Sequence, residues 1–270
     1  MTKLDFSKTA VMAIVNVTPD SFSDGGQFVN YDRAMKHIEL QIAAGADIID
    51  IGAQSTRPGA KLISVQEEIK RLTPVLKAYK QHFDVPLSLD TMVADVAAFG
   101  LEHGVDLIND VSGFTYDQQL VHVCAQGQVA VCVMHMQGQP ATMQQNPVYD
   151  NVTVDVKLFL QQQVLMCQAH GIKQIIIDPG IGFGKTLNQN LQLLNQLDQF
   201  KQLGCPILLG TSRKSFIDAI AVAGVDQRLG GTVASVVLAW QQGVQLFRVH
   251  DVFEVKQALK VAQAITEGVC

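Results

Sequence analysis

The stretch "VMAIVNVTPDSFSDGG", residues 11–26, distinguishes between two ways of building an alternating α/β chain. Its first five residues are apolar and suit a buried strand, and a helical pattern resumes only at Tyr31. An open doubly wound sheet that binds dinucleotides would carry a glycine-rich fingerprint directly after its first strand. Here that position reads Asn16-Val-Thr-Pro-Asp20, which argues against such a sheet. The polar segment from Asn16 to Gly26 is also longer than a plain turn needs, so we expect it to bind something.

The rest of the chain repeats this alternation of a short apolar run and a longer amphipathic run. Predicted strands occupy residues 11–15, 47–52, 86–90, 106–110, 129–135, 174–178, 206–210 and 245–250. Predicted helices occupy residues 31–44, 65–82, 92–103, 117–127, 151–170, 188–203, 213–242 in two pieces, and 251–267. Eight strands alternating with eight helical units are typical of an α/β (β/α)8 TIM barrel, which takes about 250 residues. No linker interrupts the pattern, so we predict a single barrel domain over residues 1–270.

The composition argues against several classes of protein. Twenty basic and 25 acidic residues give a net charge of −5, which disfavours a nucleic-acid-binding protein. No apolar run reaches the roughly 18 residues of a membrane span, and no secretory signal is found at the start. We therefore expect a soluble cytoplasmic protein that does not associate with membranes. The five cysteines form no Cys-x-x-Cys pair, and we interpret most of them as small buried residues.

Polar residues stand where the predicted strands end. In a parallel barrel the active site lies at the C-terminal ends of the strands, so these residues should form one rim. In chain order the ends carry Asn16, Ser55-Thr56-Arg57-Pro58, Asp90, Asn109, Met134-His135, Asp178, Ser212-Arg213-Lys214 and Arg248-Val249-His250. The opposite ends of the strands are bland by comparison. We therefore predict one functional site at the C-terminal rim.

The residue types on this rim suggest a substrate. Asp90, Asn109 and Asp178 offer carboxylate and amide groups that suit a flat polar heterocycle with exocyclic amines. The remaining side chains offer donors for an anion, and arginine can hold phosphate oxygens in a fork. These donors are Arg57, Lys214, Arg248 and His250. The sequence thus predicts a ligand with a polar ring and a phosphate or diphosphate.

Two motifs on the rim resemble other kinds of site. "PGIGFGKT", residues 179–186, is close to a phosphate-binding loop, but Pro179 stands where the first glycine belongs. We instead expect a turn whose glycines let a ligand approach the backbone. His135 and His250 lack a Cys or His partner at the spacing of a zinc site, so we predict no zinc there.

Taken together, eight motifs resemble those of dihydropteroate synthase, in that family's order. They are "NVTPDSFSDGG", "STRPGA", "SLDT", "LINDVSG", "VMHMQG", "DPGIGFGKT", "SRKSF" and "RVHDV", and they span residues 16 to 252. The resemblance implies a transferase that condenses 7,8-dihydropterin-6-ylmethyl diphosphate with 4-aminobenzoate. The products would be 7,8-dihydropteroate and pyrophosphate, in folate biosynthesis. It also implies a homodimer and a target of sulfonamides, and we expect residues 230–242 to be a candidate dimer surface.

The resemblance also implies roles for individual residues. The pterin would be bound by Asp90, Asn109, Met134, Asp178, Phe183 and Lys214. The diphosphate would be held by Asn16, Arg248 and His250, with Asn16 also contacting Mg²⁺. Aminobenzoate would lie beside Ser215 under two loops that carry Phe22, Thr56, Arg57 and Pro58. The catalytic residues would be Lys214, Asp90, Asp178 and Arg248.

The chemistry that the resemblance implies is dissociative. The C–O bond to diphosphate breaks first and leaves a pterin cation, which Asp90 and Asp178 would stabilise. Arg248, His250 and Mg²⁺ would stabilise the charge on the leaving group. Diphosphate leaves readily and an arylamine is an adequate nucleophile, so no strong base is needed.

The chain departs from the family pattern in its second loop. Ala53 and Gln54 stand where that family commonly has Gly and Glu, and Gln54 could alter the affinity for aminobenzoate or sulfonamides. Two alternative functions stay open. A non-catalytic pterin-binding paralogue would lose the diphosphate and aminobenzoate residues, all of which are present. A pterin-dependent methyltransferase of the same barrel type would have no need for "NVTPDSF" or "STRP".

Overall fold

Eight parallel strands form one sheet that closes on itself. The computed structural model describes residues 4–18, 27–55, 59–60, 62–139 and 141–268, with the backbone alone described at residues 27–30. The strand order is β6-β5-β4-β3-β2-β1-β8-β7. A parallel bridge between Ile177 and Ile207 joins the two ends of this order. The strands are β1 Ala10–Asn16, β2 Ile48–Gly52, β3 Leu87–Asp90, β4 Leu107–Asp110, β5 Ala130–Met134, β6 Ile175–Asp178, β7 Leu208–Leu209 and β8 Leu246–Val249.

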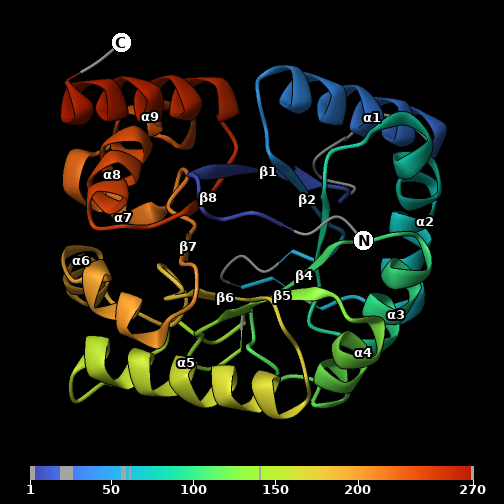
Figure 1. Ribbon diagram of the computed structural model, residues 1–270, viewed down its shortest axis with the longest axis horizontal. Coiled ribbons are helices and arrows are strands. Elements are labelled where there is room, and N and C mark those ends of the chain that lie inside the picture. The colour runs from blue at the N-terminus through green and yellow to red at the C-terminus, as the bar shows by residue number, and fades with distance from the viewer. Residues whose placement is uncertain (1–3, 19–26, 56–58, 61, 140, 269–270) are drawn as a thin grey trace.

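The helices surround this ring of strands, as Figure 1 shows. They are α1 Gln27–Ala43, α2 Val65–His82, α3 Ala94–Glu102, α4 Gln119–Gly127, α5 Val152–Ala169, α6 Leu187–Asn195, α7 Ser215–Ala221, α8 Leu229–Gln241 and α9 Val252–Glu267. Two short 3-10 helices, η2 Leu197–Leu203 and η3 Val225–Gln227, follow α6 and α7. None of the helices in the described part of the chain has the length and apolar character of a membrane span.

The strands alternate between two environments along their length. Outward side chains such as Val11, Ile49 and Ile51 pack under the helices in the main apolar core. Inward side chains near the N-terminal ends fill the barrel with a second apolar cluster. This cluster contains Leu4, Ala10, Met12, Ile48, Leu107, Ala130, Cys132, Ile176, Leu208 and Leu246. Because side chains on a strand repeat their direction every second residue, the next inward layer is fixed by this one.

That next layer is polar. Asp50, Asn109, Asp178 and Arg248 each lie two residues after a member of the inner apolar cluster, and therefore point into the same barrel interior. Three of them are almost fully buried. The apolar cluster closes the lower barrel, so this polar layer forms the floor of the open, C-terminal end.

The (β/α)8 barrel predicted from the sequence is confirmed, and several element bounds differ. α1 begins at Gln27 rather than at residue 31, and the helix predicted over residues 188–203 consists of α6 and η2. β7 contains only Leu208 and Leu209, whereas the apolar run predicted a strand over residues 206–210. The helical stretch predicted over residues 213–242 consists of α7, η3 and α8. It breaks at Val222, whose φ of 44° is left-handed, and there the Asp218 carboxylate accepts from the Ala223 amide at 2.9 Å.

Candidate active site

A guanidinium held by two carboxylates lies on one side of the barrel mouth. Arg248 on β8 donates from Nε to Asp50 Oδ2 at 2.6 Å and from Nη2 to Asp90 Oδ2 at 2.8 Å. Asp50 is fully buried on β2, and also accepts from the Ser88 hydroxyl at 2.5 Å and the Asn109 amide at 3.3 Å. Hydrogen bonds between charged groups are strong and directional in dry surroundings. The network therefore fixes Asp90, Asn109 and Arg248 relative to one another.

Asp90 lies in an environment that favours its neutral form. Burial raises the pKa of Asp90 to about 7, with Arg248 opposing the shift and the Asp50 and Glu68 carboxylates adding to it. Glu68 is itself buried on α2, where it accepts from the Thr91 hydroxyl at 3.0 Å and where burial raises its pKa. Perturbed carboxylates in an open barrel end are typical of functional sites. Asp90 thus changes its charge near neutral pH.

A second charged group lies at the ends of β6 and β7. Asp178 Oδ1 accepts from the Gly180 amide at 2.7 Å, and burial raises the pKa of Asp178 while Lys214 lowers it. The Lys214 ammonium donates to the Ile181 carbonyl and lies 4.7 Å from the centre of the Phe183 ring. Burial lowers the pKa of Lys214 to about 8, with Asp178 opposing the shift. Asp178 and Lys214 therefore influence each other's charge, and the Lys214 ammonium lies over an aromatic ring.

A small apolar surface adjoins these charges. Met134 at the end of β5 is buried with Met92 and Val111, and Met136 and Phe183 pack against them. Methionine side chains are polarizable and adapt to the shape of a ring that they contact. This surface, beside carboxylate and amide groups, suits a flat heterocycle with a polar edge.

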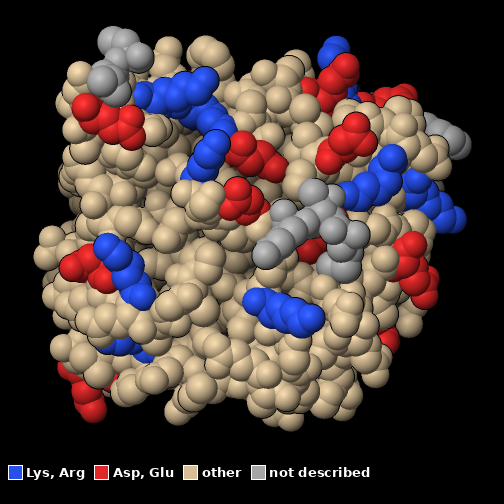
Figure 2. Space-filling view, in the orientation of Figure 1, with Lys and Arg blue, Asp and Glu red and all other residues tan. Residues whose placement is uncertain are grey.

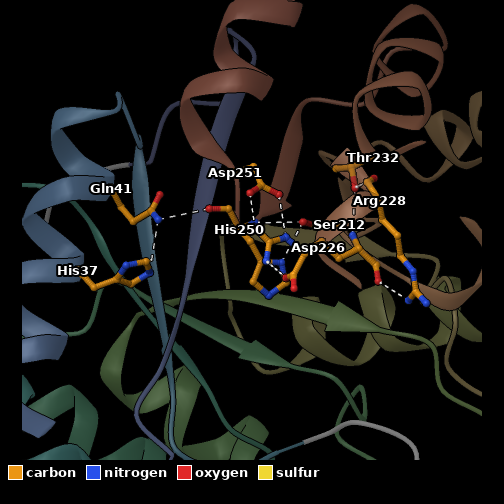
Figure 3. Close-up of polar contacts among 9 residues, drawn as sticks. His37, Gln41, Ser212, Asp226, Arg228, Thr232, His250 and Asp251 are labelled. Carbon is orange, nitrogen blue, oxygen red and sulfur yellow. Dashed lines mark hydrogen bonds and ion pairs between the residues drawn. The ribbon is translucent and has the colours of Figure 1, made fainter. Parts of the chain in front are cut away.

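His250 follows β8 and is held in place by Ser212, as Figure 3 shows. The His250 amide donates to Ser212 Oγ at 3.2 Å, and the same hydroxyl lies 2.9 Å from His250 Nδ1. Gln41 of α1 donates to the His250 carbonyl at 3.3 Å, and its amide nitrogen lies 3.4 Å from His37. When the hydroxyl donates to Nδ1, the neutral ring carries its proton on Nε2 and can donate it to an anion.

Arg213, between Ser212 and Lys214, has a structural task. Its φ of 57° is left-handed, and its guanidinium pairs with Asp251, with an Nε to Oδ2 distance of 3.0 Å. Its amide donates to Thr232 Oγ1 at 3.0 Å, and its carbonyl accepts from Arg228 at 3.0 Å (Figure 3). These contacts tie the turn that presents Lys214 to α8 and to the start of α9.

The remaining predicted residues lie around this rim or outside the described chain. Asn16 is the last residue of β1, half-buried and paired in register with Gly52. Ser215 is exposed at the first position of α7, directly after Lys214. Four predicted loop residues fall outside the residues that the structure describes: Phe22, Thr56, Arg57 and Pro58.

Comparisons with known proteins agree with this geometry. Residues 12–250 match the family described as pterin binding enzyme. A dihydropteroate synthase of Haemophilus influenzae is 46% identical over 263 residues, which cover 97% of this chain and 95% of that protein. A crystal structure of the Yersinia pestis dihydropteroate synthase with a sulfonamide drug has a TM-score of 0.92 at 44% identity, covering 98% of this chain and 96% of that one. The chain belongs to the dihydropteroate synthase family.

A third similar protein has been solved with 7,8-dihydropteroate bound. The Xanthomonas albilineans dihydropteroate synthase in complex with 7,8-dihydropteroate has a TM-score of 0.88 at 37% identity, and the match covers 97% of this chain and 95% of that one. Members of the dihydropteroate synthase family are transferases, and this chain is one of them. The family resemblance and the enzyme class predicted from the motifs are therefore confirmed.

The sequence interpretation missed Asp50, which none of the quoted dihydropteroate synthase motifs contains. Asp50 lies inside the run "DIIDIG", where the neighbouring Ile49 and Ile51 face the helices. A signal was present, because an aspartate at an inward position of a buried strand needs partners. Its partners come from β3, β4 and β8, far away in the sequence, and only the closed barrel brings them together.

Arg248 forms more hydrogen bonds within the protein than the sequence suggested. It was expected to hold the diphosphate with its guanidinium fork, but Nε and Nη2 are bonded to Asp50 and Asp90. Among the described residues none accepts a hydrogen bond from Nη1, and Nη2 uses only one of its two N–H groups. The diphosphate role predicted for Arg248 would therefore depend on the N–H groups that the two carboxylates leave over and on its charge.

The glycines after β6 serve the packing of the protein itself. A Cβ at Gly180 would lie 1.9 Å from the His135 carbonyl oxygen, and one at Gly184 would lie 2.4 Å from that of Gln137. The sequence predicted that glycines of this turn let a ligand approach the backbone; at Gly180 and Gly184 the packing of the chain itself already requires glycine, whereas a Cβ at Gly182 would face the Lys214 side chain. Gly180 and Gly184 let the turn after β6 lie against the loop after β5.

Gln54 is bonded to residues of its own loop through both ends of its amide. Its Oε1 accepts from the Ile63 amide at 2.8 Å, and its Nε2 donates to the Ser55 carbonyl at 2.8 Å. A glutamate in this position could only accept. The amide thus replaces the family's carboxylate with a group that bonds to the chain on both sides.

The charges on the face in Figure 2 are mixed rather than gathered into a field of one sign. Blue and red side chains alternate over this face, with wide uncharged areas between them. Non-specific binding of nucleic acid depends on a continuous basic surface. This face offers none, in agreement with the net charge of −5.

Proposed function

We propose that this barrel catalyses the condensation of 7,8-dihydropterin-6-ylmethyl diphosphate with 4-aminobenzoate. A C–N bond forms to the arylamine, the C–O bond to diphosphate breaks, and the amine proton is released with pyrophosphate. One observation carries the proposal: Asp90, Asn109, Asp178 and Lys214 surround one apolar surface at the barrel mouth of a dihydropteroate synthase family member. The product named for the Xanthomonas albilineans structure, 7,8-dihydropteroate, is the product that this reaction yields.

The pterin would lie on the methionine surface with its polar edge toward the buried groups. Asp178 and Asn109 would bind its amino and ring nitrogens, and Lys214 would donate to its carbonyl oxygen. Met134 and Phe183 would contact its faces. Preorganised groups cost little reorganisation during the reaction, and the networks around Asp90 and Asp178 provide that preorganisation.

The reaction separates charge, and different groups of the site would stabilise the two charges that form. When the C–O bond breaks, positive charge develops on the pterin and negative charge on the diphosphate. Ionised Asp90 and Asp178 would stabilise the first, and Arg248 Nη1 with His250 would stabilise the second. Lys214 contacts the substrate in this scheme, so we assign it, with Asp90, Asp178 and Arg248, to the catalytic residues.

The donor set at the end of β1 fits a magnesium ion carried by the substrate. Mg²⁺ prefers oxygen ligands, keeps several waters, and commonly takes one or two protein oxygens plus substrate phosphates. Asn16 offers one half-buried amide oxygen there. Within the described residues no group of three or more Asp, Glu, His or Cys gathers as a metal cage of its own. Bound Mg²⁺ would neutralise charge on the leaving diphosphate.

Aminobenzoate would bind at the outer part of the mouth, beside Ser215 and under the loops that carry Phe22, Thr56, Arg57 and Pro58. Sulfonamides would compete for this place, as a sulfonamide complex of the Yersinia pestis relative suggests. Arg57→Ala should therefore raise the KM for aminobenzoate more than the KM for the pterin diphosphate. Equal changes in both constants, measured in steady-state assays, would argue against this role.

The wider organisation follows the same proposal. We infer one cytoplasmic barrel domain over residues 1–270 and a homodimer. The apolar residues of α8 that were expected at the dimer interface differ in their exposure. Val236 belongs to the core, Val233 and Val237 are half-buried, and Leu238 is 61% exposed. Leu238 is therefore the residue of this group that a second copy could cover.

Aminobenzoate-dependent release of pyrophosphate from the pterin diphosphate, with and without Mg²⁺, tests the proposal. The condensing enzyme should release one pyrophosphate for each dihydropteroate formed. A non-catalytic pterin-binding protein would bind the pterin and release none. A methyltransferase of this barrel type would ignore aminobenzoate, so either result would overturn the proposed reaction.

A further inference from the structure

We propose that Lys185, together with His135, positions the turn after β6 that faces the pterin. Lys185 contacts no substrate atom in this proposal and acts through Phe183 and Lys214. The inference rests on the pterin site proposed above. It joins the two motifs that resembled a phosphate loop and a zinc ligand in the sequence, because their lysine and histidine are partners in the fold.

Lys185 is a buried amine surrounded by hydrogen-bond acceptors, and burial lowers its pKa well below the usual value while Asp178 opposes the shift. The residue is 2% exposed, and its Nζ lies 3.0 Å from His135 Nδ1. The carbonyl oxygens of Gly180, Phe183 and His135 lie 2.8, 2.9 and 3.2 Å from Nζ, so at most three N–H groups are shared among these three oxygens and His135 Nδ1. A buried charge is costly unless such bonds compensate it. One side chain thus links the loop after β5 to two points of the turn after β6.

His135 is suited to accept from this lysine. Burial lowers the pKa of His135 to about 2, with the Lys185 charge adding to the shift, so the ring is neutral. A neutral ring with an unprotonated Nδ1 is an acceptor. The ring packs edge-on against Phe159, with centroids 4.9 Å apart, and this contact fixes its orientation.

The turn that Lys185 holds has little freedom elsewhere. The Gly182 amide donates to Asn190 Oδ1 at 2.7 Å, and the Tyr149 hydroxyl donates to the Gly184 carbonyl at 2.7 Å. Gly180 and Gly184 lie against the loop after β5 with no room for a side chain. Close-packed segments have low compressibility and transmit strain to their neighbours. Removal of the Lys185 bonds should therefore displace the turn rather than one side chain.

This displacement would reach the substrate through two contacts. The Phe183 carbonyl accepts from Lys185, and the Phe183 ring lies under Lys214. The Lys214 ammonium is also bonded to the Ile181 carbonyl of the same turn. A shifted turn would thus move both the ring and the ammonium that are proposed to contact the pterin. In its protonated form Lys185 also lowers the pKa of Asp178 and so favours the ionised carboxylate.

The variant Lys185→Met removes the donors and keeps the length of the side chain. Lys173→Met is a matched control, because Lys173 is exposed before the other end of β6. The dissociation constant of the pterin diphosphate, measured by calorimetry, should rise by roughly tenfold or more in Lys185→Met, as expected for lost hydrogen bonds of a charged group. It should stay within about twofold of the wild type in Lys173→Met. The KM for aminobenzoate should change little in both.

A double-mutant cycle with Phe183→Ala separates positioning from mere stability. If Lys185 acts through this turn, the two losses of pterin affinity should be clearly less than additive. Fully additive losses, or wild-type affinity in Lys185→Met well below its melting temperature, would overturn the proposal. If Lys185→Met does not fold, His135→Phe keeps the ring and removes the acceptor. It should weaken pterin binding by about threefold, and unchanged binding would count against the proposal.

The outcome is distinguishable from failure of the proposed function. If the wild type binds the pterin diphosphate more tightly than Lys185→Met but releases no pyrophosphate, the reaction is refuted and the positioning role stands. If the wild type releases pyrophosphate and Lys185→Met matches it in affinity and rate, only the positioning role is refuted.

Discussion

On the β2, β3 and β8 side of the barrel mouth, the Arg248 guanidinium is bonded to two carboxylates, Asp50 and Asp90. On the β5, β6 and β7 side, the Lys185 and Lys214 ammonium groups are bonded mainly to main-chain carbonyl oxygens. Carbonyl dipoles satisfy a cation without cancelling its charge, whereas carboxylates do both. When Asp50, Asp90, Glu68 and Arg248 are all ionised, the first side has an excess of two negative charges. On the second side the Lys214 charge offsets that of Asp178, and Lys185, whose pKa burial lowers, is the remaining basic group.

This difference suits a reaction that separates charge. A developing pterin cation is attracted by the side with excess carboxylate, and the polar groups of the neutral pterin are held by Asp178 and Lys214. The two sides should therefore respond differently to substitution. Loss of a group on the β6 and β7 side should remove contacts with the substrate, whereas loss of Asp50 should act through Arg248.

The largest effect is expected on the β6 and β7 side. Lys214→Ala and Asp178→Ala should each lower kcat by about two orders of magnitude or more, because each removes a charged contact made in the transition state. Thermal unfolding of the purified variants should show that the barrel is intact. Near-normal rates in both variants would remove the basis for placing the pterin there.

Asp50→Asn is expected to have a smaller effect, since Asp50 touches no substrate in the proposed site. It should lower kcat/KM by roughly tenfold, the size expected when one charged hydrogen bond is lost. Asp47→Asn is a matched control before the start of β2, where the exposed Asp47 carboxylate pairs with Lys256 at 2.5 Å. It should leave kcat/KM within about twofold. Equal losses in the two variants would mean that the Arg248 network has no special role.

The pH profile should sharpen the comparison further. Because the pKa of Asp90 is raised to about 7, kcat/KM should rise as the pH passes through that value and the carboxylate ionises. Because the pKa of Lys214 is lowered to about 8, kcat/KM should fall as the pH passes through that value and the ammonium loses its proton. Asp50→Asn should move the rising limb to lower pH, since the Asp50 charge raises the pKa of Asp90. A rising limb that stays in place would contradict the coupling.

The smallest effect is expected outside both regions, at Gln54. Gln54→Glu keeps the acceptor for the Ile63 amide and removes the donor to the Ser55 carbonyl. We expect a change of about threefold or less in the KM for aminobenzoate and none in the KM for the pterin diphosphate, because the lost bond to the Ser55 carbonyl lies on the second loop. Inhibition by a sulfonamide, measured in parallel, should change by the same factor as the KM for aminobenzoate. A larger change in the pterin constant would place Gln54 in the pterin site.

The fold and the rim residues were accessible from the sequence because each depends on local pattern. Apolar runs of strand length, regular helical spacing and the polar residues after each run located the barrel and the positions of Asp90, Asn109, Asp178 and Lys214. The partners of these residues were not accessible. Asp50 meets Arg248 across 198 positions, and Lys185 meets His135 across 50. Only closure of the barrel and the packing of neighbouring loops create such pairs.

The barrel should open most readily at the seam between β6 and β7, where the sheet closes. β7 has two residues, and a single bridge with the Ile177 amide donating to the Pro206 carbonyl at 3.0 Å joins it to β6. By comparison β2 and β3, where the Ile49 amide donates to the Pro86 carbonyl at 3.0 Å, pair over three positions. Local opening is cheapest where the fewest bonds must break, so the Ile177 amide should exchange its hydrogen for deuterium before that of Ile49. Lys214 and Asp178 lie on opposite sides of this seam, so its opening would change the distance between them and thereby set how often the site is complete.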